Sequence, residues 1–411
     1  MTVSSERLSA EIDELAKFSA HPSPAVTRVI FSSEDLAARV WLVEKCQDAG
    51  LETRFDAVGN FFARRVGSDP SLPAIATGSH IDAIPNAGRF DGVVGVLGGL
   101  EAIRSLHESG VRLRHSVELI MFTAEEPTRF GIGCLGSRLL SGALDPSAAD
   151  ALSDSDGNSL AVLRRKAGLE GSLDTVRLAD GFYSAFVELH IEQGPILERE
   201  ELDIGVVEKI AAPAALRVRF VGEGGHAGAV LMPDRHDAAL GAAETALAVE
   251  RRVLGSGSPD CVGTAGLWRI LPGAINSVPC EAVMEIDIRD TQIRSRDGVL
   301  EGLRRDIEEI AARRGLQVTI ETISADPPAT CAPEVIEAIE DAVRCEGLAA
   351  RRLVSRAYHD SLFLARVAPT SMIFIPCHRG YSHRPDEFSS PDQIARGVAV
   401  LAESIRSLDS L

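Results

Sequence analysis

The sequence lacks the motifs of several large enzyme classes. It contains no GxSxG nucleophile elbow and no P-loop, and its glycine-rich run at 92–100, GVVGVLGGL, does not fit the GxGxxG pattern of dinucleotide-binding proteins. Its seven cysteines include no CxxC pair, which disfavours disulfides and thiolate metal sites. These absences remove the main competitors of a mechanism that rests on histidines and carboxylates.

Basic residues and long apolar runs are also scarce. The chain has 42 Lys and Arg against 60 Asp and Glu, a formal net charge of -18, and no basic cluster, which disfavours nucleic-acid or anionic-membrane partners. No apolar stretch reaches the roughly 18 residues of a membrane span. The first residues are acidic and amphipathic where a signal peptide would have a basic region before an apolar one. We therefore expect a cytoplasmic protein with a small-molecule substrate.

The length and apolar content suit two domains. The chain has 411 residues, of which 45% are hydrophobic. Helical patterns lie at 6–18, 34–49 and 92–109, and they alternate with strand-like runs at 52–64, 72–77 and 117–123. This alternation predicts an α/β fold with a largely parallel sheet. The segment 142–181 reads as loop.

A change of pattern marks an inserted domain. Between 212 and 328 the elements follow a βαββαβ order, which is ferredoxin-like. Ala211-Ala212-Pro213 and Asp326-Pro327-Pro328 flank this segment as plausible hinges. We predict a discontinuous catalytic domain at 1–212 and 329–411, with the second domain inserted at 213–328.

Four strand-like runs are followed or closed by residues that bind metals. The motifs are GSHID, AEEPTRF, HIEQG and CHRGYSHRPDE. In an open α/β sheet, ligands bind at the carboxyl ends of strands, so distant residues can converge there. Mixed imidazole and carboxylate ligands suit a pair of divalent cations about 3.5 to 4 Å apart. The predicted ligands are His80, Asp91, Glu126, His190 and His383, with Asp91 bridging the two cations. The alternative interpretation is that the four runs are ordinary buried strands without a metal site.

The remaining candidates carry distinct roles. Glu125 is our general base, because a carboxylate beside a dication but not bound to it can accept a proton, although a Glu pair is more often solvated surface. Asp82 is placed to orient the His80 ring. Arg289 and Asn276 could bind a carboxylate, or Arg289 could pair with Asp287 or Asp290. Taken alone, His226 is better interpreted as a loop histidine in a glycine-rich turn, and His359-Asp360 could be no more than a helix-capping pair. We expect His107, His115, His236 and His378 on solvated faces or in loops.

These motifs resemble the amidase, hydantoinase and carbamoylase branch of the M20 hydrolases. The matching stretches are GSHIDAIPNAGRFDG, EEPTRFGIGCLGSR, ELHIEQGPILE, HAGAVLMPDRHDA, GAINSVP, DIRD, YHDS and GYSHRPDEFSS. The resemblance implies a dinuclear catalytic domain and an inserted dimerisation or lid domain. It also implies a homodimer in which His226 stabilises the oxyanion in the partner's site. Asn276 and Arg289 would bind the substrate carboxylate. The pocket would be lined by Gln193, Tyr358 and His359.

Several variants of these motifs are similar to ureidoglycolate amidohydrolases. They are EEPTRF, HAGAVLM, SRAYHDS, MIFIPC and GYSHRPDEFSSP. This similarity implies hydrolysis of the ureido bond of ureidoglycolate with two Mn²⁺ ions, although Zn²⁺ suits the same ligands, and Tyr358 on the substrate hydroxyl. The alternatives are hydrolysis of N-carbamoyl-L-amino acids or allantoate, and a non-catalytic protein that binds ureido acids. A true dipeptidase is disfavoured, because the HAG, GAIN and DIRD set suits a small carboxylate.

Overall fold

The structure, a computed structural model, describes residues 2–410 and divides the chain into two compact units. The second unit consists of Lys209–Ala329 and Val354–Tyr358, and the first contains the other described residues. Compared with the predicted insertion at 213–328, the second unit also takes in Val354–Tyr358. The first predicted hinge is not a loop, because only Ala211 separates β8 (Ile204–Ile210) from β9 (Ala212–Val221).

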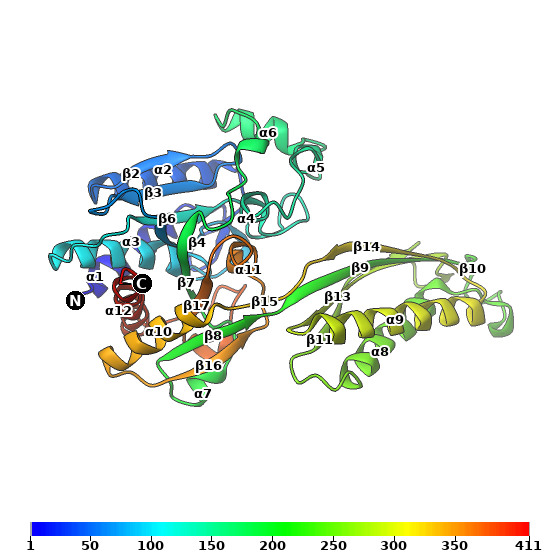
Figure 1. Ribbon diagram of the computed structural model, residues 1–411. Coiled ribbons are helices and arrows are strands. Elements are labelled where there is room, and N and C mark those ends of the chain that lie inside the picture. The colour runs from blue at the N-terminus through cyan, green and yellow to red at the C-terminus, as the bar shows by residue number, and fades with distance from the viewer. Residues whose placement is uncertain (1, 411) are drawn as a thin grey trace. The chain divides into compact units, whose positions relative to one another are not determined.

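The first unit is built on a nine-stranded mixed sheet in the order β15-β8-β17-β7-β4-β6-β3-β2, with β16 paired to β8 (Figure 1). The bounds are β2 Glu52–Phe55, β3 Phe61–Arg65, β4 Ala74–His80, β6 Val117–Phe122, β7 Tyr183–Ile191, β15 Ala329–Thr330, β16 Ala350–Ser355 and β17 Thr370–Ile375. The four central strands β17, β7, β4 and β6 are parallel. The flanking strands β8 and β3 are antiparallel to them.

The expectation of a largely parallel sheet is therefore correct only for the centre. The run at 52–64 is a hairpin of β2 and β3 rather than one strand. Asp56 explains the reversal, because its carboxylate accepts hydrogen bonds from the backbone N–H groups of Val58, Gly59 and Asn60 and so closes a tight turn.

Helices cover both faces of this sheet. On one face lie α3 (Val93–Glu108) and α12 (Pro391–Leu408), next to α1 (Ser5–Leu15) and α10 (Pro333–Glu346). α3 lies very close to the strands, since a Cβ at Gly95 would come within 2.5 Å of the Leu189 carbonyl oxygen. The other face packs in a separate core with α4 (Leu135–Leu140) and α11 (Asp360–Leu364). Alternate strand residues serve the two faces, as in any buried sheet.

The first unit also contains further elements. They are β1 (Val26–Arg28) paired with β5 (Ala83–Ala87), α2 (Ser33–Asp48), α5 (Pro146–Ala151), α6 (Leu160–Lys166), η1 (Leu173–Thr175), α7 (Ile196–Arg199) and η3 (His378–Gly380). The expectation that 142–181 is loop is thus wrong in part, because Asp145, Ser159 and Ser172 cap the first turns of α5, α6 and η1. Among the described residues, no helix has both the length and the apolar content to cross a bilayer.

The second unit has an antiparallel sheet in the order β11-β13-β9-β14. β11 spans Val262–Leu271, β13 Glu281–Asp290 and β14 Gln317–Ala325; α8 (Ala238–Leu254) and α9 (Ile293–Arg314) pack side by side on the sheet (Figure 1). This is the βαββαβ order that the sequence predicts. A two-stranded sheet of β10 (Gly225–His226) and β12 (Ser277–Val278) and the turn η2 (Met232–Asp234) complete the unit.

Candidate metal centre

Four of the five predicted metal ligands lie at the carboxyl ends of the four central parallel strands or in the segments that follow them, and the fifth, Asp91, lies in the turn between β5 and α3. His80 is the last residue of β4, and His190 lies one residue before the end of β7. Glu126 lies in the bend that follows β6, and His383 lies in the segment after β17. Adjacent parallel strands end at the same edge of a sheet, so these side chains meet although they are far apart in the sequence.

Asp91 lies between the histidines. Its Oδ1 is 3.2 Å from His190 Nε2 and 3.6 Å from His80 Nε2. Its Oδ2 is 3.2 Å from His383 Nε2, and that nitrogen is 3.3 Å from Glu126 Oε1. The ligand atoms thus form two groups, one of His80, Asp91 and His190 and one of Asp91, Glu126 and His383. Both groups contain Asp91.

The hydrogen bonds around these groups suit divalent cations. His80 Nδ1 is 3.0 Å from the carbonyl oxygen of Asp82, and His190 Nδ1 is 2.9 Å from that of Ile191. Because a carbonyl oxygen only accepts, each Nδ1 carries a proton, and each Nε2 is directed to Asp91. Imidazoles that bind metals are held in this way. The donor set therefore fits Mn²⁺ or Zn²⁺.

Besides the orientation of the histidines, an unpaired acceptor on Gln193 indicates that a ligand binds beside Asp91. Its Nε2 donates to Asp91 Oδ2 at 2.8 Å. Its buried Oε1 has no hydrogen-bond partner within residues 2–410, although a buried amide oxygen normally has one. An acceptor beside Asp91 is thus left for a group that arrives from outside the chain.

The pKa values show how strongly these groups depend on one another. Hydrogen bonds with Asp91 and Glu126 raise the pKa of His383 to about 11. Burial would raise the pKa of Asp91, but His190, His383 and His80 together hold it well below its usual range. Burial would lower the pKa of His80, but the negative charge of Glu125, with Asp91 and Asp82, raises it well above its usual value. Positive charge is therefore favoured among these buried carboxylates, and either protons on the histidines or bound cations would provide it.

Glu125 is adjacent to both groups and belongs to neither. Its Oε2 is 3.7 Å from His80 Nε2, and burial raises the pKa of its carboxyl group well above the usual range. The carboxylate of Asp82 accepts the backbone N–H groups of Glu125 and Glu126 at 3.3 and 3.0 Å. Asp82 Oδ1 is also 3.7 Å from His80 Nδ1. Asp82 therefore positions the Glu pair as well as the His80 ring.

Two residues that our sequence reasoning missed hold Asp91 in place. Ser382 Oγ donates to Asp91 Oδ2 at 2.6 Å and lies 2.9 Å from Glu387 Oε2. Glu387 Oε1 accepts the backbone N–H groups of Phe90 and Asp91 at 2.8 and 3.0 Å. Burial and the charge of Asp91 raise the pKa of Glu387 to about 7. Both residues lie in the GYSHRPDE motif, in which our sequence reasoning assigned a role only to His383.

His359 is fully enclosed beside His190. The two ring centroids are 4.4 Å apart, and Glu188 joins them as a third group of possible ligand atoms. Glu188 is also held by the hydroxyl groups of Ser79 and Ser361, at 2.7 and 2.6 Å. His359 precedes α11, but its side chain forms no cap, so the capping alternative is wrong for it.

The other predicted residues lie in the second unit. His226 is exposed in β10, and the backbone of Asn276 accepts a hydrogen bond from Ala227 N–H at 2.8 Å. Arg289 pairs with Asp287 through Nε and Nη2, the alternative considered from the sequence. The Arg289 guanidinium also lies over the Tyr358 ring, 5.4 Å from its centroid. These four residues thus belong to one unit, and Arg289 and Tyr358 are in contact.

The remaining histidines lie on exposed faces or in loops, as expected. His107 and His378 are exposed, and His236 lies in the loop before α8. His115 lies in the bend before β6 and is buried there, with Nδ1 2.7 Å from the Pro73 carbonyl oxygen. All seven cysteines are free, as expected for packing residues, although Cys345 is exposed.

Comparison with known proteins identifies the family. The model of the peptidase family M20/M25/M40 matches residues 76–407. The chain belongs to this family. A ureidoglycolate hydrolase of Arabidopsis thaliana is 50% identical to this chain over 415 residues, which cover 99% of this chain and 87% of the relative. An N-carbamoyl-L-amino-acid amidohydrolase of Pseudomonas sp. strain NS671 is 36% identical over 98% of both chains. The crystal structure of AtUAH in complex with glyoxylate superimposes with a TM-score of 0.94 at 50% identity, covering 100% of this chain and 99% of the other.

Proposed function

We propose that this chain is an amidohydrolase that cleaves the ureido C–N bond of ureidoglycolate at a site for two divalent cations, with Mn²⁺ as the expected ion. The observation that carries the proposal is the sharing of Asp91 by two groups of ligand atoms, one at each of its oxygens. A single carboxylate between two imidazole-containing groups is the arrangement that a bridged pair of cations needs. The 50% identity to a ureidoglycolate hydrolase favours that substrate over others with the same ureido group.

The reaction adds water to the ureido carbonyl, expels ammonia, and leaves a carbamate that loses carbon dioxide. The remaining hemiaminal releases a second ammonia and glyoxylate. Two bound cations supply Lewis acidity towards the carbonyl and towards the attacking water. Glu125 accepts the proton of that water and delivers it to the leaving nitrogen, because it is buried beside the ligands without being one of them.

The second unit supplies the substrate contacts in this proposal. We assign Arg289 to the substrate carboxylate, because a guanidinium can bind a carboxylate through two parallel N–H donors. In this structure it pairs with Asp287 and also donates through Nη1 to the Arg356 carbonyl oxygen at 3.2 Å. Asn276 binds the same carboxylate, and Tyr358 meets the hydroxyl group of the substrate. Gln193 and His359 line the pocket on the side of the metal ligands. A Tyr358→Phe enzyme should lose selectivity for hydroxylated over plain ureido acids; unchanged selectivity would remove Tyr358 from this role.

We further propose that a second copy of the chain completes the site. His226 then crosses the interface and stabilises the oxyanion. The second unit carries exposed apolar side chains that suit such an interface: Leu240, Leu247 and Leu254 are spaced by seven along α8 and are 39%, 63% and 80% exposed. They form one stripe on the helix. β11, on which α8 packs, is an edge strand with an exposed Trp268.

Ammonia release tests the function. Metal-free protein would be reconstituted with Mn²⁺ or Zn²⁺ and assayed with ureidoglycolate, allantoate and an N-carbamoyl-L-amino acid. We expect metal-dependent turnover that is fastest with ureidoglycolate. Turnover of N-carbamoyl amino acids alone would assign the chain to the carbamoylases instead. Binding of ureido acids without any ammonia release would favour a non-catalytic binding protein.

A further inference from the structure

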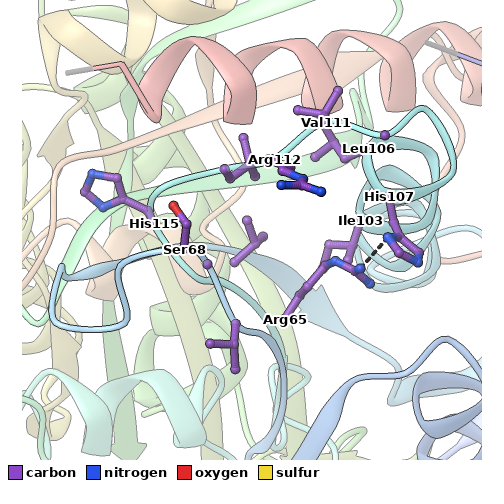
Figure 2. A pocket seen from close by; sticks show the side chains of 13 residues that line it. Arg65, Ser68, Ile103, Leu106, His107, Val111, Arg112 and His115 are labelled. Atoms are coloured by element: carbon purple, nitrogen blue, oxygen red, sulfur yellow. Dashed lines mark hydrogen bonds between the residues drawn. The ribbon is translucent and has the colours of Figure 1, made fainter.

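A second cavity lies in the first unit, away from the candidate metal centre (Figure 2). Its volume is about 510 Å³, within the usual range for small-molecule sites. It is formed by the end of β3, the last turn of α3 and the segment that leads into β6, including Arg65, His107 and Val117. β6 begins at this cavity, and the bend after its other end carries Glu126. At about 3.3 Å per residue, its six residues separate the two places by roughly 20 Å.

The cavity concentrates positive charge in an acidic protein. Arg65, Arg112, His107 and His115 line it, and none of its 13 lining residues is acidic. Arg112 makes no hydrogen bond or ion pair with any residue in the range 2–410. Arg65 contacts only the ring of His107, and burial lowers its pKa without a carboxylate to oppose the effect. Figure 2 shows the guanidinium of Arg112 directed into the cavity.

Some arginines of the first unit pair with carboxylates, as Arg54 does with Glu118 and Arg104 with Glu11. Others bind neutral groups instead, as Arg28 does with backbone carbonyl oxygens. Arg65 and Arg112 differ in that they line one cavity together, with no acidic side chain in its lining. An anionic group from outside the chain would therefore find guanidinium donors there without competition from a lining carboxylate.

Three carboxylates that lie near this segment, either in the sequence or through hydrogen bonds, are already engaged. Glu108 pairs with Arg7, and Asp69 accepts the hydroxyl and N–H groups of Ser71. Asp409 accepts the backbone N–H groups of residues 114 and 115. The carboxyl end of α3 adds about half a negative charge at the cavity. Two full guanidinium charges outweigh it.

Apart from Ser68, the other side chains of the lining are apolar. Ile103, Leu106 and Val117 are buried and form an apolar wall. We propose that the cavity is a binding site for a small organic anion, with its phosphate or carboxylate group held by Arg65 and Arg112 and its apolar part placed against this wall. Guanidinium groups bind both head groups through paired N–H donors, so the shared chemistry is an oxyanion on an apolar body.

Calorimetric titration of the full-length, metal-loaded protein tests the site. The probes are phenyl phosphate, phenylacetate and the uncharged benzyl alcohol, and the first two distinguish a phosphate from a carboxylate site. We expect saturable binding of at least one anion, no binding of benzyl alcohol, and at least tenfold weaker binding in the Arg65→Gln/Arg112→Gln variant. Arg114→Gln, which removes the same charge from a neighbouring residue outside the lining, should change little.

Two further measurements distinguish binding at this cavity from binding at the metal centre and from unfolding of the double variant. Anions that occupy the metal centre would inhibit ammonia release and would bind the double variant as well as the wild type. Arg112→Glu changes an exposed side chain without partners, so it should fold and should abolish binding if the double variant proves unstable. Equal binding to wild type and Arg112→Glu, or equal loss in Arg114→Gln, would overturn the proposal. So would the absence of saturable binding up to about 10 mM.

Discussion

Gly92 is the most direct test of the proposed centre, because it joins Asp91 to the first turn of α3. Its φ of +67° is unfavourable for any residue with a side chain. A Cβ at this position would lie 2.4 Å from Nε2 and Cδ2 of His80 and 2.5 Å from Cε1. Gly92→Ala therefore places a methyl group against the face of a predicted metal ligand.

The expected magnitude follows from these distances. The left-handed backbone alone costs about 1 to 2 kcal/mol in an alanine variant. Restoring ordinary contact of about 3.5 Å requires the His80 ring or the Asp91 turn to move by about 1 Å. A misplacement of that size in a catalytic constellation costs about 100-fold in rate, which corresponds to about 2.7 kcal/mol.

The assay compares metal content and turnover with a matched glycine. Gly50 has a φ of +74°, and a Cβ there would meet no atom within 4 Å, so Gly50→Ala carries the strain without the contact. Both variants should lose thermal stability, and Gly92→Ala should lose more because it adds the contact with His80. Only Gly92→Ala should lose bound Mn²⁺ after gel filtration and about 100-fold in kcat for ammonia release. Full metal content and activity in Gly92→Ala, or equal losses in Gly50→Ala, would refute the reasoning.

Three further variants separate the roles of neighbouring residues. Glu125→Gln should retain the metal but lose about 100-fold to 10,000-fold in kcat, because it removes the proton acceptor; loss of metal would instead make Glu125 a ligand. Glu387→Ala should weaken Mn²⁺ binding by about 10-fold to 100-fold, because it removes the acceptor of the Phe90 and Asp91 backbone N–H groups and the contact with Ser382; unchanged affinity in a metal titration would contradict its positioning role. Leu247→Glu, on the exposed stripe of α8, should shift the protein from dimer to monomer in light scattering, while Glu250→Gln serves as a control on the same helix; a dimer that persists would place the interface elsewhere.

The sequence predicts the candidate centre well because its ligands lie at strand ends. His80, Glu126 and His190 each follow or end an apolar run, and the order of parallel strands brings such positions to one edge. Ser382 and Glu387 could not be assigned in this way. Their roles depend on a contact with the Asp91 turn almost 300 positions away, which no local pattern encodes.

For the fold too, local sequence patterns predict some elements, while features that depend on tertiary contacts are missed. The helices predicted at 34–49 and 92–109 begin and end within one residue of α2 and α3, because their apolar spacing is a local signal. The hairpin at 52–65 escaped prediction, because its turn depends on one side chain, Asp56. The inclusion of Val354–Tyr358 in the second unit also escaped it, because membership of a compact unit is set by tertiary contacts.

The position of β17 has a consequence for synthesis on the ribosome. β17 lies between β7 and β8 in the sheet, yet it is translated more than 150 residues after both. Until it emerges, the nascent chain carries β7 with one edge unsatisfied, and the second unit can fold first. An open apolar strand edge invites pairing with other chains. Chaperone dependence of this protein should therefore be concentrated in the interval before residue 375 leaves the exit tunnel.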